Sequence, residues 1–210
     1  FAELTETSWG SATYNGTTTP TEPVDFGGVA AVALSSYGLA HCALLADGSV
    51  HCWGAAWSGQ LGNGGEPSQN WVASAEPNRV LLPEGSKAVA LTTGNSHSCV
   101  LIENGSAMCW GDASGGRLGN GFTSSGIFTS PQWVNLPSGV SLISISAGQY
   151  NTCGIVENFS GVCWGMNGHY QLGGSGWPGN DTSTEDEFVH LAGSEFVGVA
   201  GIDLGFVTGC

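Results

Sequence analysis

Four mostly apolar segments recur along the chain. They are VAAVALSS at residues 29–36, KAVALTTG at 87–94, VSLISISAG at 140–148 and FVGVAGIDLG at 196–205. Continuous apolar runs of about eight residues are typical of strands that are buried on both faces. We therefore expect four equivalent strands of this kind.

Each apolar segment leads into a pattern that predicts a hairpin. In the first complete copy, residues 41–64, Asp47-Gly48 lies between two short runs rich in Leu, Val and Ala, as in a hairpin turn. A three-residue loop with Gly48 in the left-handed conformation sets Cys42 directly opposite Cys52. Opposite residues at a site without ladder hydrogen bonds have Cα atoms about 4.5 Å apart, at the short end of disulfide geometry. The pattern therefore predicts a cross-strand disulfide.

The second copy, residues 97–121, leads to the same prediction independently. A three-residue loop with Gly105 at the left-handed position sets Cys99 opposite Cys109. Because two copies give the same register, we expect a disulfide in each hairpin.

The third copy, residues 151–175, keeps the cysteine spacing but changes the turn. Cys153 and Cys163 are as far apart as the earlier pairs, whereas Phe159 takes the glycine position of the turn. A bulky residue rarely adopts the left-handed conformation, so we expect this loop to be built differently. We predict that these two cysteines are also bonded.

The cysteines give the repeat a nearly constant period. The first cysteines of successive units, at positions 42, 99, 153 and 210, are 57, 54 and 57 residues apart. Four short strands per unit at constant period are typical of β-propeller blades. We expect an all-β chain of four-stranded antiparallel blades: the end of a preceding blade at 1–28, repeats at 29–86, 87–139 and 140–195, and the start of a truncated fourth repeat at 196–210.

Composition and charge narrow the classes of partner. With 35 Gly and only 10% charged residues, the chain fits many short strands joined by tight turns. Three Lys+Arg against 17 Asp+Glu give a net charge of -14, which argues against attraction to nucleic acid or to an anionic membrane surface. No run approaches the roughly 20 apolar residues that span a bilayer. We therefore predict no nucleic-acid partner and no membrane insertion by this chain.

The seven cysteines indicate an oxidising compartment. Six of them form three pairs with identical spacing, which favours disulfides, whereas zinc ligands usually lie two to four residues apart at a turn. We therefore predict an extracellular or cell-surface location and no cofactor or metal. The seventh, Cys210, has no partner ten residues later. We expect either an intermolecular bond at Cys210 or a longer polypeptide.

The recurring residues resemble the repeat of the regulator of chromosome condensation. In the second unit the pattern is met by Gly94, His97, Cys99, Asn104, Gly105, Cys109, Trp110, Gly111, Leu118, Gly119 and Gly121, with Arg117 replacing Gln. The cysteine-bearing form is similar to extracellular propellers and to the β-lactamase inhibitor protein II type. The first unit has His41 one place nearer its cysteine, and the third has Asn151 in place of the histidine. The histidine is thus expected to be structural.

The resemblance implies a seven-bladed ring in which each blade contacts its neighbours. At about 56 residues per blade a ring needs roughly 390 residues, so this chain would supply about half. We expect the ring to be completed by further sequence or by another chain, and we favour a larger protein seen in part.

We consider two classes of function. The first is a secreted or cell-surface binding or structural module, in which variable loops select a protein partner or the remaining blades of the same propeller. The loops carry aromatic residues suited to an interface, although these residues could instead pack over neighbouring blades. They are Trp57, Trp71, Phe122, Phe128, Tyr170 and Trp177.

The second class is an enzyme, or an enzyme inhibitor, whose site is assembled across blades. None of the five histidines lies in a metal motif, and the sequence has no Gly-x-Ser-x-Gly elbow or phosphate loop. Guanine-nucleotide exchange, the activity of the family's namesake, fits poorly with disulfides and strong acidity. We therefore predict that the chain is not an enzyme and has no catalytic residues.

Four sequons could carry glycans in a eukaryotic secretory route. They begin at Asn15, Asn104, Asn158 and Asn180. Asn104 and Asn158 occupy hairpin turns, where Asn-Gly at Asn104 is also good turn chemistry. Asn158 is the stronger candidate because it is followed by Phe159, so Asn-Gly turn chemistry does not explain the asparagine there.

Overall fold

The computed structural model describes residues 4–7, 11–14, 24–66, 73–168, 171–172 and 189–191. The described elements are strands, with one short 3-10 helix. The strands are β1 (Leu4–Thr7), β2 (Ser11–Tyr14), β3 (Ala31–Tyr37), β4 (Ala40–Leu45), β5 (Val50–Ala55), β6 (Ala73–Arg79), β7 (Ala88–Thr93), β8 (His97–Ile102), β9 (Ala107–Asp112), β10 (Ile127–Trp133), β11 (Leu142–Ala147), β12 (Asn151–Val156), β13 (Gly161–Gly165) and β14 (Val189–Leu191). The 3-10 helix η1 spans Ser114–Gly116. The chain is therefore all-β, as its sequence predicts.

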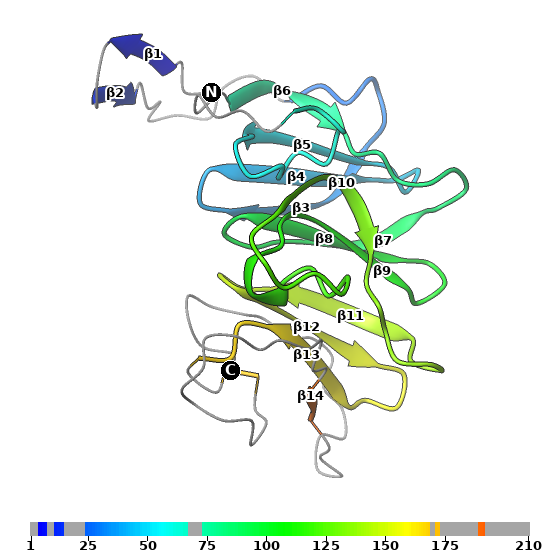
Figure 1. Cartoon of the computed structure of the whole chain (residues 1–210). Helices are drawn as coiled ribbons and strands as arrows, with labels where there is room; N and C mark the ends of the chain where they lie inside the picture. Colours follow the sequence, from blue (N-terminus) through cyan, green and yellow to red (C-terminus); the bar gives the residue numbers. More distant parts are fainter. Residues whose placement is uncertain are drawn as a thin grey trace.

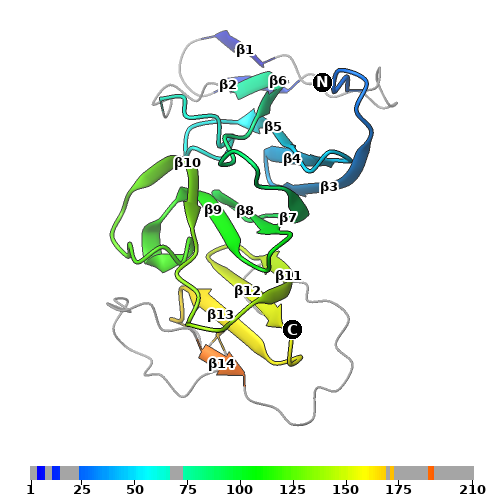
Figure 2. The same ribbon diagram turned by 90° about the vertical axis from the view of Figure 1, so that its right-hand side faces the viewer.

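Three four-stranded antiparallel sheets form the body of the structure. Their strand orders are β3-β4-β5-β6, β7-β8-β9-β10 and β11-β12-β13-β14, so each sheet is a meander of consecutive strands. The sheets are stacked face to face down the length of the molecule (Figure 1). The view at 90° shows the same succession (Figure 2). We call them the first, second and third blades. The pair β1-β2 forms a separate two-stranded sheet.

The hairpin of each blade has the register expected from its cysteines. Residues opposite each other on the second and third strands include Cys42 and Cys52 in the first blade. The structure joins three pairs by disulfides, Cys42–Cys52, Cys99–Cys109 and Cys153–Cys163, each with a Cα–Cα distance of 4.1 Å. All six cysteines are buried, so the bonds lie inside the stack of blades.

The expectation that the third hairpin turn is built differently is wrong. Phe159 has φ 62° and occupies the left-handed position that Gly48 and Gly105 occupy in the other blades. Its N–H donates to the Val156 carbonyl at 2.8 Å, as the Gly48 N–H donates to Leu45. The Asn158 side chain also holds the turn, because its Oδ1 accepts from both the N–H and the hydroxyl of Ser160. These bonds offset a left-handed cost of about 1–2 kcal/mol, and the Phe159 side chain stays 50% exposed.

The expectation that the apolar strand at the start of each repeat is buried on both faces is also wrong in part. In β3, Leu34 is 71% exposed. In each of the three blades, the pairing of the first strand with the second slips by one residue. The extra residue of such a bulge is left unpaired. The residues at this position are Val32, Val89 and Ile143, and all three are exposed.

The hydrophobic core lies between blades rather than within them. One cluster joins Cys42, Leu44, Val50 and Cys52 of the first blade to Val100, Ile102, Met108 and Trp110 of the second. The other cluster joins the second blade to Leu142, Ile145, Val156, Val162 and Trp164 of the third. At each of these two contacts the earlier blade presents its cysteine-bearing face and the later blade its tryptophan-bearing face. We call such a contact a junction.

Candidate protein-binding surface

The meander topology separates two kinds of loop onto opposite ends of the blades. The hairpin turns at residues 46–48, 103–105 and 157–159 share one end, which we call the turn end. The loop between β6 and β7 lies there too, because the Ala88 N–H donates to the Gly48 carbonyl at 3.0 Å. The loops after the third strand of each blade lie at the other end, which we call the loop end. These longer loops are the variable ones in the sequence.

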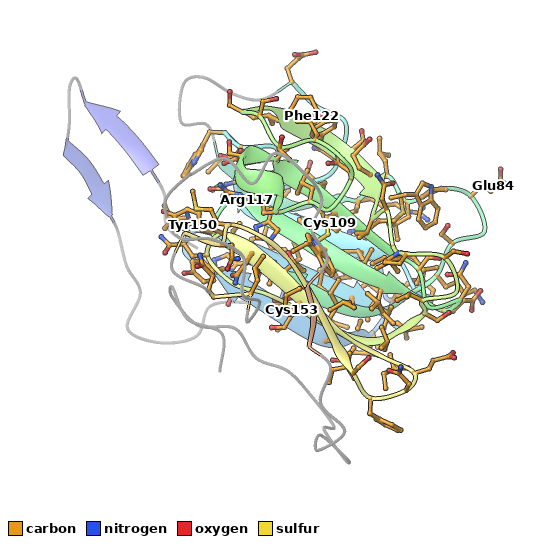
Figure 3. All side chains as sticks on the ribbon, turned by 60° about the horizontal axis from the view of Figure 1, so that its bottom comes forward. Glu84, Cys109, Arg117, Phe122, Tyr150 and Cys153 are labelled. Atoms are coloured by element: carbon orange, nitrogen blue, oxygen red, sulfur yellow. A yellow bond between two sulfur atoms is a disulfide. The ribbon has the colours of Figure 1, made fainter. Side chains whose placement is uncertain are left out.

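A hydrogen-bonded turn fixes the loop that follows β9. Asp112 Oδ1 accepts from the N–H and the hydroxyl of Ser114 at 2.9 and 2.6 Å. Arg117 Nε donates to the Ser114 carbonyl, and Arg117 Nη1 forms an ion pair with Asp112 Oδ2 at 3.4 Å. The guanidinium is also 5.0 Å from the centre of the Tyr150 ring, and Figure 3 shows these two side chains together. The buried Arg117 thus ties the loop to the third blade.

The same loop presents an aromatic pair at the loop end. Phe122 and Phe128 are in edge-to-face contact with ring centres 5.4 Å apart. Phe128 packs against the core of the second junction, whereas Phe122 is 38% exposed and Ile127 is also exposed. Figure 3 shows Phe122 at the molecular surface, well separated from Glu84 of the turn end. The pair therefore combines a rigid base with an accessible apolar edge.

The first blade contributes to the same surface. A Cβ at Gly59 would lie 2.9 Å from Ile127 Cγ2, so the glycine allows the first-blade loop to approach β10. The Gly64 N–H donates to the Thr129 carbonyl at 2.8 Å. A neighbouring cavity of about 270 Å³ is lined by Leu61, Asn63, Ser74 and Asn78, among others. The surface thus spans two blades.

A hydrogen bond joins the signature residues of neighbouring blades at both junctions. Trp110 Nε1 donates to the Gln60 carbonyl at 2.8 Å, and Trp164 Nε1 donates to the Arg117 carbonyl at 3.1 Å. Gln60 and Arg117 precede the Leu-Gly pairs of their loops. Trp110 and Arg117 are recognisable repeat positions in the sequence, but no local spacing indicates which residue of a neighbouring blade each of them contacts.

His97 is buried in the second junction. The Thr152 hydroxyl donates to the Arg117 carbonyl at 3.0 Å, so it accepts from His97 Nε2, also at 3.0 Å. Nδ1 is then the unprotonated nitrogen, and it has no hydrogen-bond partner among the described residues. Burial, followed by the charge of Arg117, lowers the pKa of His97 to about 3. A neutral histidine in this position is structural.

The other residues singled out in the sequence are distributed as follows. Trp57 lies in the first-blade loop and is half-buried. Trp71, Tyr170, Trp177, Asn15, Asn180 and Cys210 lie outside the described residues. Of the predicted interface residues that the structure describes, it brings together only Phe122 and Phe128. It adds Ile127, the first residue of β10, which the sequence does not single out because one aliphatic residue at the start of a strand gives no signal.

Asn104 and Asn158 lie exposed at the turn end. Their Oδ1 atoms accept from the N–H groups of Ser106 and Ser160, both at 3.0 Å. Asp47 makes the same contact with Ser49 in the first blade. The serine two residues after each of these side chains is therefore explained by its hydrogen bond in the turn, because the first blade has the same serine without a sequon.

The described residues contain neither a metal-binding cluster nor a membrane-spanning helix. No group of three or more His, Cys, Asp or Glu side chains within the described ranges is arranged to hold a metal ion. Those ranges include no helix with the length and apolar character needed to cross a bilayer.

Comparison with known sequences places the repeat. Residues 47–101 match the model of the regulator of chromosome condensation (RCC1) repeat. The chain is 33% identical over 162 residues to human "Probable E3 ubiquitin-protein ligase HERC3", covering 76% of this chain and 15% of that protein. It is 29% identical over 144 residues to the "Ultraviolet-B receptor UVR8" of Arabidopsis thaliana, covering 68% and 31%. The chain therefore spans less than a third of either relative.

Solved structures agree on the fold. Human WBSCR16 superposes with a TM-score of 0.72 at 21% identity, covering 92% of this chain and 47% of that one. Prp20p of Saccharomyces cerevisiae gives 0.69 at 17% identity, covering 84% and 42%. Residues 47–101 therefore match an RCC1 repeat, and the successive four-stranded blades of the described part have the fold of a partial β-propeller similar to these structures.

Proposed function

We propose that this chain is a protein-binding module of the secretory route that holds its partner at the loop end, through Phe122, Ile127 and Phe128. The observation that carries the proposal is the edge-to-face pair of Phe122 and Phe128, with its exposed apolar edge on a fixed base. Aromatic residues held rigidly at a surface are typical binding hot spots.

The scaffold supports this role. Buried disulfides fix each hairpin, and Arg117 fixes the loop against the third blade. Little conformational freedom is then lost when a partner binds. A propeller of this fold, yeast RCC1 (Prp20), has been crystallised with the protein Kap60 bound, which supports protein binding as a use of the architecture.

The compartment is part of the proposal. Three buried disulfides support an extracellular or cell-surface location, since cytosolic thiols are kept reduced. The measurement is alkylation of the native-source protein under denaturing conditions, before and after reduction. Six protected thiols at these positions are expected before reduction, and free thiols there would argue for a cytosolic protein.

The proposal assigns no reaction to the module. A partner that is itself an enzyme would be inhibited or positioned by contact alone, as in the β-lactamase inhibitor protein II type that the sequence resembles. A reaction catalysed by the purified protein with no partner present would count against this part of the proposal.

The binding surface can be tested by site-specific photo-crosslinking. A photoreactive amino acid at Ile127 in the protein expressed in its own cells is expected to give a discrete adduct, identifiable by mass spectrometry. The same probe at Glu84, on the exposed loop of the turn end, serves as the matched control. The proposal requires Phe122→Ala to lose the Ile127 adduct while secretion and disulfides are retained. Equal adducts from both positions would contradict it.

A further inference from the structure

The outer strands of the first and second blades have the same register on their hairpins. Ser74 of β6 pairs with Gly54, and Phe128 of β10 pairs with Gly111. Gly54 and Gly111 each follow the tryptophan of their hairpin. Ser74 is therefore the first-blade counterpart of Phe128.

Small residues of the first blade take the places of the apolar cluster in the second. The same register makes Ala73 the counterpart of Ile127. Gly65 and Phe122 each lie four residues after the leucine of their Leu-Gly pair, so they correspond as well. All three small residues line the cavity of about 270 Å³, and they are Gly65, Ala73 and Ser74. The first blade is thus hollow where the second blade holds its aromatic pair.

The cavity has the size of an aromatic ring. An engineered apolar cavity of about 150 Å³ takes up benzene, so a cavity of about 270 Å³ has room for a ring with a substituent. Ala56 and Leu61 give the cavity an apolar wall, against which a ring can bury its faces. The size of the cavity and the two rings missing from it both indicate an aromatic occupant.

Polar groups form the rest of the wall. Asn63 Nδ2 donates to Asn78 Oδ1 at 3.1 Å, and Asn78 Nδ2 donates to Ser74 Oγ at 2.7 Å, so the amides hold one another in place. Glu66 lines the cavity and is exposed, which puts its carboxylate at the mouth. A carboxylate only accepts hydrogen bonds. The occupant should therefore carry a hydrogen-bond donor on its ring and no negative charge.

We propose that this cavity binds a phenol ring, and that the ring is the side chain of a tyrosine on the protein partner. The inference rests on the proposed function, since it places the same partner on the loop end. Gly59 lines the cavity, and a Cβ there would lie 2.9 Å from Ile127 Cγ2, so the cavity adjoins the exposed apolar edge. The partner's ring enters the first blade at the place that Phe128 takes in the second, and its hydroxyl donates to Glu66.

The cavity can be tested without the partner, by saturation-transfer NMR on the intact polypeptide. The probe p-cresol, which is the tyrosine side chain as a free molecule, is expected to bind. The probe p-toluate carries a carboxylate on the same ring and should bind about tenfold more weakly, because Glu66 repels it. Ser74→Phe fills the cavity with the ring of the second blade and should abolish binding of p-cresol. Ser138→Phe, at an exposed position between β10 and β11, is the matched control and should leave binding unchanged.

A second variant does not depend on filling the cavity. Glu66→Gln removes a charge at an exposed position, and it should let p-toluate bind nearly as well as p-cresol. Absence of p-cresol binding to the unmodified protein would overturn the cavity as a ring site. Binding of p-cresol only after Trp71→Ala would do the same, because a ring of this chain would then be the occupant. Equal binding of p-cresol to the Ser74→Phe and Ser138→Phe variants would place the probe elsewhere and overturn the assignment.

The source of the ring is tested by photo-crosslinking from Ile127 in the protein's own cells. Ser74→Phe should greatly reduce the partner adduct, whereas Ser138→Phe should retain it, with secretion and disulfides intact in both. An unchanged adduct in Ser74→Phe, or an adduct with a second copy of this chain, would overturn the partner's tyrosine as the occupant. If the unmodified protein gave no adduct, the proposed function and the tyrosine would both be overturned, whereas the p-cresol result would still decide whether the cavity binds a ring.

Discussion

Trp110 Nε1 lies 2.8 Å from the backbone oxygen of Gln60, a residue 50 positions earlier and in the neighbouring blade. This bond connects the two most recognisable parts of the repeat, the Trp-Gly that ends a hairpin and the Leu-Gly loop that follows one. Residues that look like separate parts of a repeat are therefore the two halves of one contact, each supplied by a different copy.

Replacing the Trp110 indole should weaken the first junction. Trp110→Phe keeps an aromatic ring but leaves the buried Gln60 carbonyl without this donor, a loss of about 1–3 kcal/mol in the free energy of unfolding. Denaturant unfolding monitored by circular dichroism measures the change. Trp133→Phe, at an exposed position of β10, is the matched control and should change stability by less than about 0.5 kcal/mol. Equal losses in the two variants would contradict the assignment.

The glycine beneath an indole should tolerate no side chain. Gly119 has φ 63°, and a Cβ there would lie 2.8 Å from Trp164 Nε1 and 3.0 Å from Val134 Cγ1. Gly119→Ala should therefore add about 1–3 kcal/mol of overpacking to the backbone strain. Gly139 has φ 79°, and no atom of the described residues would lie within 4 Å of a Cβ there, so Gly139→Ala isolates the backbone strain of about 1–2 kcal/mol. Thermal unfolding should therefore give a lower midpoint temperature for Gly119→Ala than for Gly139→Ala.

His97 should make the fold less stable in acid. Its pKa is about 3 in the folded protein and about 6.5 in the unfolded chain, so the unfolded state binds the additional proton. This contribution is complete above pH 6.5 and should decrease by about 2 kcal/mol between pH 7 and pH 5.

The matched variant for this effect is His97→Asn, which installs the residue found at the same position of the third blade, Asn151. His97→Asn should reduce the difference in unfolding free energy between pH 7 and pH 5 by that amount, whatever its effect at pH 7. An unchanged difference would show that His97 is not buried as a neutral imidazole.

A glycine should improve the third hairpin turn. Phe159→Gly removes left-handed strain of about 1–2 kcal/mol at φ 62°. The glycine also gives the unfolded chain more conformational entropy, which lowers stability by about 0.4–1 kcal/mol. Chemical denaturation is expected to show a net stabilisation of between zero and about 1.5 kcal/mol. Gly105→Ala is the reverse change in the second blade, where a Cβ would lie 2.7 Å from Ser141 Cβ, and it should destabilise. A destabilised Phe159→Gly would mean that the exposed ring contributes more than the strain costs.

Local sequence was enough to predict the hairpins. The spacing of Cys42 and Cys52 around Asp47-Gly48 predicts their register, because turn type and loop length fix which residues face each other. At Phe159 the left-handed cost alone predicts a different turn, but the Asn158 side chain and the pairing of the flanking strands hold Phe159 in the left-handed conformation.

Contacts between blades lie beyond local rules. Nothing in the neighbourhood of Gln60 indicates that its carbonyl meets Trp110, since the contact depends on how one sheet stacks on the next. Likewise, the apolar run around Val32 predicts burial, but Val32 is the unpaired residue of a bulge and its side chain is exposed. Of the candidate binding surface, the sequence supplied Phe122 and Phe128, whereas Ile127 joined them only through the fold.

The location of the core between blades has an evolutionary consequence. Because both described junctions pair the same two kinds of face, duplication of one repeat inserts a unit that already fits both neighbours, and deletion of one brings together two faces that fit each other. A substitution inside a junction, by contrast, changes the fit between two copies, so Trp110 and Gly62 must be inherited together.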